Sequence, residues 1–276
     1  MAAASLRALL AHSIDYAGMF PPCNLGLEPA LQNHSKYIRE ADAWMSSNFI
    51  LPTRQFAALR GALVQFDRNH PLRISALGSK TETAATFRPA LQEAMDAIGK
   101  FSAEYAGVVS IDQFEMLLPG DADLAALAEA AAMFGEMKLH VFWEASGETP
   151  EQAIALLAQH NSKKNTRVFG YKLRTGGVTA DAFPSAAQIG GALVAAARNR
   201  VPIKFTAGLH HPIRQFRDEV KTKMHGFLNV LGAGVLAAEH DWDQGQISRM
   251  LEDENADSFC SLLWRLLSYP YPVQRR

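Results

Sequence analysis

The stretch from Val168 to Thr206 reads VFGYKLRTGGVTADAFPSAAQIGGALVAAARNRVPIKFT. It begins with one apolar run, residues 168–173, and ends with another, residues 201–206. The Ala-rich segment between them, Ser185–Asn199, has the composition of a helix. Runs that are apolar almost throughout are typical of parallel strands covered on both faces. The stretch therefore predicts a strand–helix–strand unit with two parallel strands.

The same alternation extends in both directions along the chain. The predicted strands are His12–Ala17, Met45–Leu51, Leu72–Leu77, Ala106–Ile111, Lys138–Trp143, Val168–Leu173, Val201–Thr206 and Gly226–Leu231. The predicted helices are Leu27–Glu40, Thr53–Phe66, Ala84–Lys100, Asp123–Phe134, Pro150–His160, Ser185–Asn199 and Ala256–Leu267. Eight such strands in 276 residues predict an α/β protein, a (β/α)8 TIM barrel in a single domain, residues 1–276. Its C-terminal helical segment is expected at about 244–276, and a doubly wound open sheet is the alternative.

Composition excludes several classes of protein. Hydrophobic residues make up 48% and charged residues 20% of the chain, which is enough to build a core and excludes general disorder. The formal net charge of −1 leaves no global basic field, so we expect no nucleic-acid partner. No apolar run approaches the roughly 18 residues of a membrane helix, and the N-terminal apolar stretch is short and interrupted. We therefore expect a cytoplasmic, enzyme-sized protein with no membrane association.

Two lysines inside predicted strands, Lys172 and Lys204, are the most informative residues. Lysine is depleted in strands and rarely buried without a partner. Partial burial beside a second ammonium group would favour a neutral amine, the form that attacks carbonyl groups to give a Schiff base. Alternatively, both lysines pair with carboxylates such as Glu144 or Asp15, or bind an anionic substrate. Spacing alone favours these two alternatives together over the Schiff base.

Glycines follow the sixth, seventh and eighth predicted strands and suggest an anion-binding site. Backbone N–H groups in such loops can bind phosphate late in a barrel, although glycine is also common in ordinary turns. The candidate substrate-binding residues are Arg174, Thr175, Gly176, Gly177, Gly208, His210, His211, Asn229, Gly232 and Gly234.

The pair His210-His211 also raises the question of a metal site. Adjacent histidines on an extended segment do not easily direct both rings to one ion, so we expect no metal and no other cofactor. One of the two histidines is expected to face the pocket as an anion ligand or a general acid or base. Asp112 and Glu115, placed after the fourth predicted strand, are further acid–base candidates.

Short motifs along most of the chain resemble class I aldolases of the deoxyribose-phosphate aldolase type. The family's sixth-strand Lys-x-x-Thr-Gly is similar to residues 172–176, and its seventh-strand Lys motif is similar to residues 204–210. Ile14-Asp15 on the first strand, Glu144 at the end of the fifth, and the glycines of residues 232–234 also resemble family positions. The motifs RTGG and AGLHHP are similar to those of uncharacterised bacterial proteins, which implies no activity.

The aldolase resemblance implies a role for each matching residue. Lys172 would be the Schiff-base nucleophile and Lys204 would lower its pKa, with Asp15 or Glu144 orienting the pair. The family's fourth strand carries an Asp for proton relay, where this sequence has Gly107, so Asp112 or Glu115 would have to replace it. Arg174, Phe205 and Gly234 also depart from the family's pattern, which leaves the deoxyribose-phosphate activity without support.

Three functions remain as expectations. The first is a Schiff-base lyase that acts through Lys172 on a small oxygenated carbonyl compound, with or without a phosphate. The second is a non-covalent isomerase or lyase in which Lys172, Arg174, Lys204 and His210 bind an anionic substrate. The third is a non-catalytic barrel that binds a small molecule. In each case the partner is a small, anionic molecule, and a homo-oligomer through the C-terminal segment remains open.

Overall fold

The computed structural model describes residues 4–145 and 149–259. Seven parallel strands form one curled sheet, a half-barrel, in the order β1-β2-β3-β4-β5-β6-β7. The strands are β1 (Ile14–Tyr16), β2 (Ser46–Pro52), β3 (Leu72–Leu77), β4 (Val109–Leu118), β5 (His140–Ala145), β6 (Phe169–Arg174) and β7 (Ile203–Thr206). A separate antiparallel hairpin, β8 (Gln215–Arg217) with β9 (Thr222–Met224), follows β7. The α/β class and the parallel order of the predicted strands are confirmed.

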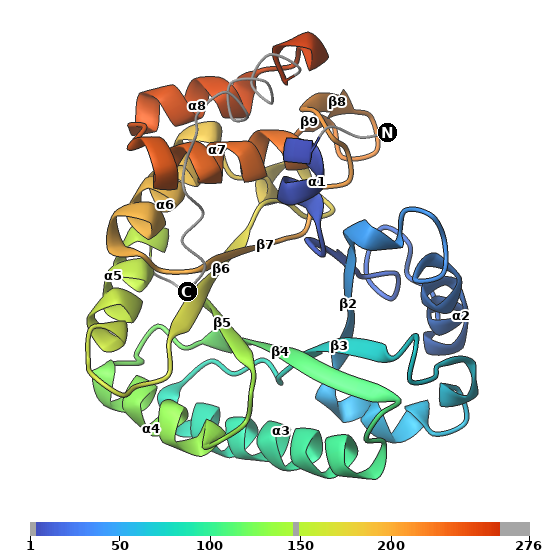
Figure 1. Cartoon of the computed structure of the whole chain (residues 1–276). Coiled ribbons are helices and arrows are strands. Elements are labelled where there is room, and N and C mark those ends of the chain that lie inside the picture. The colour runs from blue at the N-terminus through green and yellow to red at the C-terminus, as the bar shows by residue number, and fades with distance from the viewer. Residues whose placement is uncertain (1–3, 146–148, 260–276) are drawn as a thin grey trace.

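Helices lie on the outer side of the curled sheet (Figure 1). They are α1 (Ala4–Leu10), α2 (Leu27–Tyr37), α3 (Ala84–Glu104), α4 (Leu124–Phe134), α5 (Pro150–Asn161), α6 (Ala186–Asn199), α7 (Phe227–His240) and α8 (Gln244–Glu252). The short 3-10 helices are η1 (Ala43–Met45), η2 (Thr53–Leu59), η3 (Leu63–Gln65) and η4 (Ala180–Ala182). Both α5 and α6 begin with a capping box, Thr149 with Gln152 and Ser185 with Gln188, which fixes where each helix starts.

The core lies between the outer face of the sheet and these helices. Strand residues alternate between the two faces of a sheet, so the buried Tyr171 and Leu173 of β6 face outward while Lys172 between them faces the inside of the curl. Trp143 of β5 and Phe114 of β4 are fully buried in the same core. The charged side chains of these strands, such as Lys172, lie on the inner face, and this is where the candidate site forms.

The predicted eighth strand, residues 226–231, is wrong. No eighth parallel strand occurs among residues 4–145 and 149–259, and these residues begin helix α7 instead. The buried positions Val230, Ala233 and Ala237 recur at helical spacing. A short apolar run does not distinguish a buried strand from a buried helix, and here the continuous run to His240 favours the helix.

Two other predicted elements are corrected. The fourth strand was placed at residues 106–111, whereas β4 covers residues 109–118 and pairs with β3 and β5 along its length. The helix predicted at Thr53–Phe66 is replaced by η2 and η3, with Gly61 between them, where a glycine disfavours a continuous helix. The helix predicted at Ala256–Leu267 begins at Ala256, and its part beyond residue 259 lies outside the described residues.

Candidate active site

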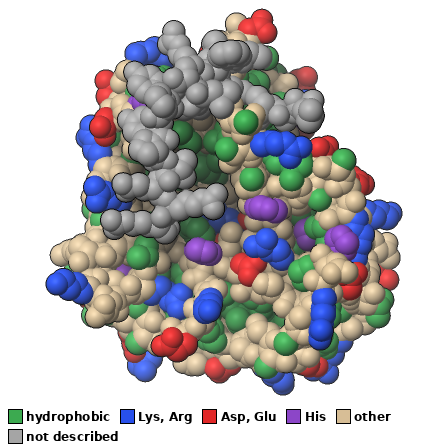
Figure 2. All heavy atoms as spheres, viewed as in Figure 1, with side chains coloured by type: hydrophobic (Ala, Val, Ile, Leu, Met, Phe, Trp, Pro, Cys, Tyr) green, Lys and Arg blue, Asp and Glu red, His purple; other side chains and the backbone are tan. Residues whose placement is uncertain are grey.

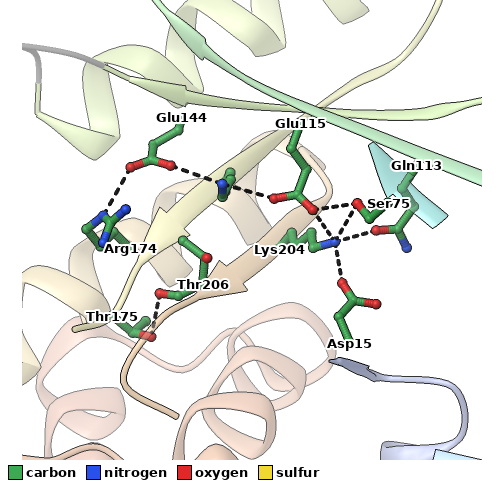
Figure 3. A network of polar contacts seen from close by, with 10 residues as sticks. Asp15, Ser75, Gln113, Glu115, Glu144, Arg174, Thr175, Lys204 and Thr206 are labelled. Carbon is green, nitrogen blue, oxygen red and sulfur yellow. Dashed lines mark hydrogen bonds and ion pairs between the residues drawn. The ribbon is translucent and has the colours of Figure 1, made fainter. Parts of the chain in front are cut away.

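Six charged side chains on the inner face form a chain in which the sign of the charge alternates (Figure 3). In order they are Asp15 of β1, Lys204 of β7, Glu115 of β4, Lys172 of β6, Glu144 of β5 and Arg174 of β6. We call this set the charge chain. Residues from five strands therefore meet at one place, and all four residues proposed as catalytic belong to it.

Lys204 lies beside Asp15 at one end of the charge chain. Its Nζ is 2.5 Å from Oδ2 of Asp15 and 2.7 Å from Oε1 of Glu115. It also donates hydrogen bonds to Ser75 Oγ, at 3.3 Å, and to Gln113 Oε1. Since β1 and β7 are the two edges of the sheet, the ion pair with Asp15 joins edges that share no backbone hydrogen bonds in the strand order. Lys204 thus connects the two edges of the curled sheet.

Glu115 lies between the two lysines and contacts each with a different oxygen. Oε1 faces Lys204, and Oε2 is 3.0 Å from Nζ of Lys172. Ser75 Oγ donates a further hydrogen bond to Oε1 at 2.5 Å. Burial raises the pKa of the Glu115 carboxyl, but the ammonium groups of Lys204 and Lys172 outweigh burial and lower this pKa to about 2. Glu115 is therefore an anion across the physiological pH range.

The carboxylate of the fourth strand is Glu115, and it does not lie at the position of Gly107, which the resemblance aligns with the family's Asp. Gly107, the residue aligned with the family's Asp, precedes β4 in a turn at φ +85°. Asp112, the other candidate, is bound outside the charge chain by Arg73 at 2.8 Å and by Ser110 at 2.5 Å. Of the two acid–base candidates, Glu115 is the one that contacts both lysines.

Lys172 and Lys204 are register partners on neighbouring strands, so their side chains share the inner face. Their ammonium groups nevertheless both contact Glu115. By itself burial lowers the pKa of Lys204, but the carboxylates of Glu115 and Asp15 outweigh it and raise this pKa above its ordinary value. Lys204 is accordingly a permanent cation, and its field on Lys172 is offset by the carboxylate that both lysines contact.

The other end of the charge chain opens into a pocket. Nζ of Lys172 is 3.1 Å from Oε2 of Glu144, and Nε of Arg174 is 3.2 Å from Oε1 of the same carboxylate. These three residues line a pocket of about 230 Å³ at the carboxyl ends of β5 and β6 and the starts of α5 and α6. Lys204 does not line this pocket. Of the two strand lysines, Lys172 is the one that belongs to the lining of this pocket.

Phe142 of β5 lies close to the charge chain on the inner face. Its ring centroid is 5.8 Å from Nζ of Lys204. The ring packs against Gly170 of β6, where an added Cβ would come within 2.5 Å of the ring. Gly170 thus leaves room for an aromatic ring that favours a cation beside it.

The loops after β6 and β7 are packed against each other. The Cα atoms of Gly176 and Gly208 approach so closely that a Cβ on Gly176 would lie 2.7 Å from Gly208 Cα. A Cβ on Gly177 would lie 2.5 Å from the side chain of Ala182. Thr175 is fully buried, and its Oγ1 donates to the carbonyl oxygen of Ala207 at 2.5 Å. Close loop packing is thus a sufficient reason for these four residue types.

The remaining candidate binding residues lie away from the charge chain. Gly232 and Gly234 are inside α7, so the expected glycine loop after an eighth strand is wrong. Asn229 is fully buried, accepts a hydrogen bond from the N–H of Arg214 and donates to the carbonyl oxygens of Met250 and Asp253.

His210 and His211 follow β7, where His211 forms a backbone bridge to Gly226 and His210 is exposed. Burial of part of its ring and the neighbouring His211 lower the pKa of His210. Neither histidine has an ion pair or side-chain hydrogen bond with a member of the charge chain. On the face of the molecule that is turned to the viewer in Figure 1 and Figure 2, basic, acidic and histidine side chains are interspersed, and the visible side chains form no broad surface of one charge.

Sequence reasoning missed Ser75 and Gln113, which bind Lys204 directly. Ser75 is a fully buried polar residue within the apolar strand β3, which was a usable signal. There was no such signal for Gln113, because the predicted fourth strand ends at residue 111 and β4 extends to residue 118.

Comparison of the sequence with protein-family models and with curated proteins finds no match. Within residues 4–145 and 149–259, no helix is long and apolar enough to cross a membrane. In the same part of the chain, no three His, Cys, Asp or Glu side chains are grouped so that they could bind a metal ion. The fold and the site thus define an α/β half-barrel with a chain of six alternating charges, of which Lys172, Glu144 and Arg174 line a pocket.

Proposed function

We propose that the protein is a Schiff-base lyase that cleaves a carbon–carbon bond in a small oxygenated carbonyl compound, with Lys172 as nucleophile. The observation that carries the proposal is the contact of Glu115 with both strand lysines. This contact provides a fourth-strand carboxylate that Gly107 does not, and its pKa of about 2 suits Glu115 to stabilising a cation and not to relaying a proton. The pocket beside Lys172, and not Lys204, supports the choice of nucleophile.

The first step is loss of a proton from the Lys172 ammonium group, because only the neutral amine attacks a carbonyl. Glu144 Oε2, at 3.1 Å, is the proton acceptor, since Glu115 has a pKa of about 2 and holds a proton poorly. The amine nitrogen then bonds to the carbonyl carbon, and the carbinolamine takes back the proton held by Glu144 and loses water to give an iminium ion. The carboxylate of Glu115 stabilises this cation as it stabilised the ammonium group.

The iminium ion then accepts the electron pair of the breaking carbon–carbon bond and becomes an enamine. The Glu144 carboxylate, which lines the same pocket, accepts the proton of the substrate hydroxyl, so that the departing fragment is released as an aldehyde. Protonation of the enamine carbon and addition of water release the second fragment and regenerate Lys172. No oxidant or reductant is needed.

A second candidate is a non-covalent isomerase or lyase, and the position of Arg174 favours it. The Arg174 guanidinium lines the same pocket as Lys172, and its planar group suits oxyanion binding. Under this alternative Lys172 acts only as a charge, so Lys172→Arg retains activity.

Reductive trapping separates the two candidates. The protein is incubated with a panel of small aldehydes and ketones and sodium cyanoborohydride, and the adducts are located by peptide mass spectrometry. The proposal predicts an adduct on Lys172 that is absent in Lys172→Met and Lys172→Arg. Lys100→Met, a change at an exposed lysine of α3, is the matched control and retains the adduct. A folded wild-type protein with no adduct on Lys172 contradicts the proposal.

A further inference from the structure

Arg174 lies at the pocket with part of its hydrogen-bonding capacity unused. Its Nε binds Glu144, and its Nη1 makes one long contact, 3.5 Å, to the carbonyl oxygen of Gly176. Within the described part of the chain, Nη2 of Arg174 has no hydrogen-bond partner. About half of the side chain is exposed. The guanidinium group can therefore bind an incoming oxyanion through its outer nitrogens.

Arg174 and Lys172 are coupled through a single carboxylate. Glu144 uses Oε1 for Arg174 and Oε2 for Lys172. The two side chains are two residues apart on one strand and so share a face. Because one carboxylate reaches both nitrogens, a molecule of only a few atoms also reaches both. Its anionic group must therefore lie close to its carbonyl carbon.

The starts of two helices add to the positive potential of this pocket. Pro150 is the first residue of α5 and Gln188 lies in the first turn of α6, and both line it. The helices have 12 and 14 residues, long enough for their N-terminal partial charges to favour an anion nearby. Glu144 and Glu151, which lies in the first turn of α5, oppose this potential, so the anion is held chiefly by Arg174.

We infer that the substrate is a small 2-oxo acid, with a carboxylate beside its carbonyl group, and that its binding to Arg174 draws the guanidinium from Glu144 so that Glu144 accepts the proton of Lys172. This inference rests on the proposed function, because it assigns the substrate class of the same nucleophile. It makes deprotonation of Lys172 depend on the bound anion. A neutral carbonyl compound leaves Glu144 held between its two cations.

The test uses three ketones that differ in one group: pyruvate, hydroxyacetone and hydroxyacetone phosphate. Each is incubated with the protein and cyanoborohydride, and the rate of adduct formation on Lys172 is divided by that on the exposed Lys100, which corrects for intrinsic reactivity. We expect this normalised rate to be about tenfold or more higher for pyruvate than for hydroxyacetone, the effect of one charge-assisted hydrogen-bonded pair. In Arg174→Gln the preference falls to within about twofold of parity, and Arg174→Lys restores part of it.

Arg88→Gln is the matched control, because Arg88 is an exposed arginine whose Nη1 pairs with Glu129 at 3.0 Å on the outer helices. It retains the wild-type preference. Labelling of Lys172 without preference for pyruvate, or with a preference that survives in Arg174→Gln, overturns the inference and leaves the proposed function intact. A preference for hydroxyacetone phosphate replaces the carboxylate with a phosphate and also overturns it. Absence of labelling by all three ketones overturns the proposed function and the inference together.

Discussion

The two ends of the charge chain contain the same residue type in different surroundings. At the end beside Asp15, Lys204 has four acceptors, Asp15, Glu115, Ser75 and Gln113, and is not among the residues that line the pocket. At the open end, Lys172 has two carboxylates and lines the pocket. The two lysines are neighbours on adjacent strands, but their partners differ, and Lys172 alone of the two lines the pocket. The comparison assigns stability chiefly to Lys204 and reactivity to Lys172.

The largest loss of unfolding free energy is expected from a change at Glu115, which contacts both lysines. Glu115→Gln leaves two buried ammonium groups facing a neutral amide, so we expect the free energy of unfolding to fall by about 3–5 kcal/mol. Urea denaturation measures this loss. Glu144→Gln, at the more exposed end, is the matched change and should cost less; equal losses would contradict the contrast between the ends.

The two lysines themselves give the next effect. Lys204→Met leaves Asp15 and Glu115 without their shared cation and should cost about 3 kcal/mol of unfolding free energy. Lys172→Met should cost about 1–2 kcal/mol, because Glu115 keeps Lys204 and Glu144 keeps Arg174. The order for adduct formation is reversed, with complete loss in Lys172→Met. A larger stability loss in Lys172→Met would contradict the assignment.

Acid should weaken the charge chain at Glu115. Its pKa is about 2 in the folded protein against an ordinary value of 4.5, so its contribution to stability is present above pH 4.5 and is lost as the pH falls toward 2. Unfolding free energies measured across this interval should therefore decline more steeply in the wild type than in Glu115→Gln. Parallel curves for the two proteins would show that Glu115 is not held as an anion by the lysines.

The smallest stability effect is expected at Arg174. Its side chain is about half exposed, and exposed ion pairs contribute little, so Arg174→Gln should change the unfolding free energy by less than about 1 kcal/mol. Thermal or urea unfolding checks this. A loss as large as that of Lys204→Met would mean that Arg174 supports the fold and would remove the basis for its role in substrate binding.

The members of the charge chain were partly predictable from sequence. Lys172 and Lys204 stood out because a charge within an apolar strand must find a partner, and Asp15 and Glu144 were expected beside them. Glu115 was recognised only as a loop candidate. The polar side chains of Asp112, Gln113 and Glu115 interrupt the apolar pattern of β4, because that strand lines a polar interior.

The fold was predictable where strand and helix patterns alternate clearly, as in residues 168–206. The failure at residues 226–231 has a physical reason: an apolar run that is buried in either state does not reveal its period in six residues. From the sequence, the glycines after β6 and β7 suggested an anion-binding site. The structure shows a second reason for glycine there, the close approach of Gly176 to Gly208, which is a tertiary contact. Local sequence contains no signal of such a contact.

The most direct test of the account is the site of reductive labelling in the wild-type protein. After treatment with pyruvate and cyanoborohydride, peptide mapping is used to compare the adduct on Lys172 with that on Lys204. We predict an adduct on Lys172 and none on Lys204, because Lys204 is held as a cation by Asp15 and Glu115 and does not line the pocket. An adduct on Lys204, or equal labelling of both lysines, would contradict the division between the two ends of the charge chain.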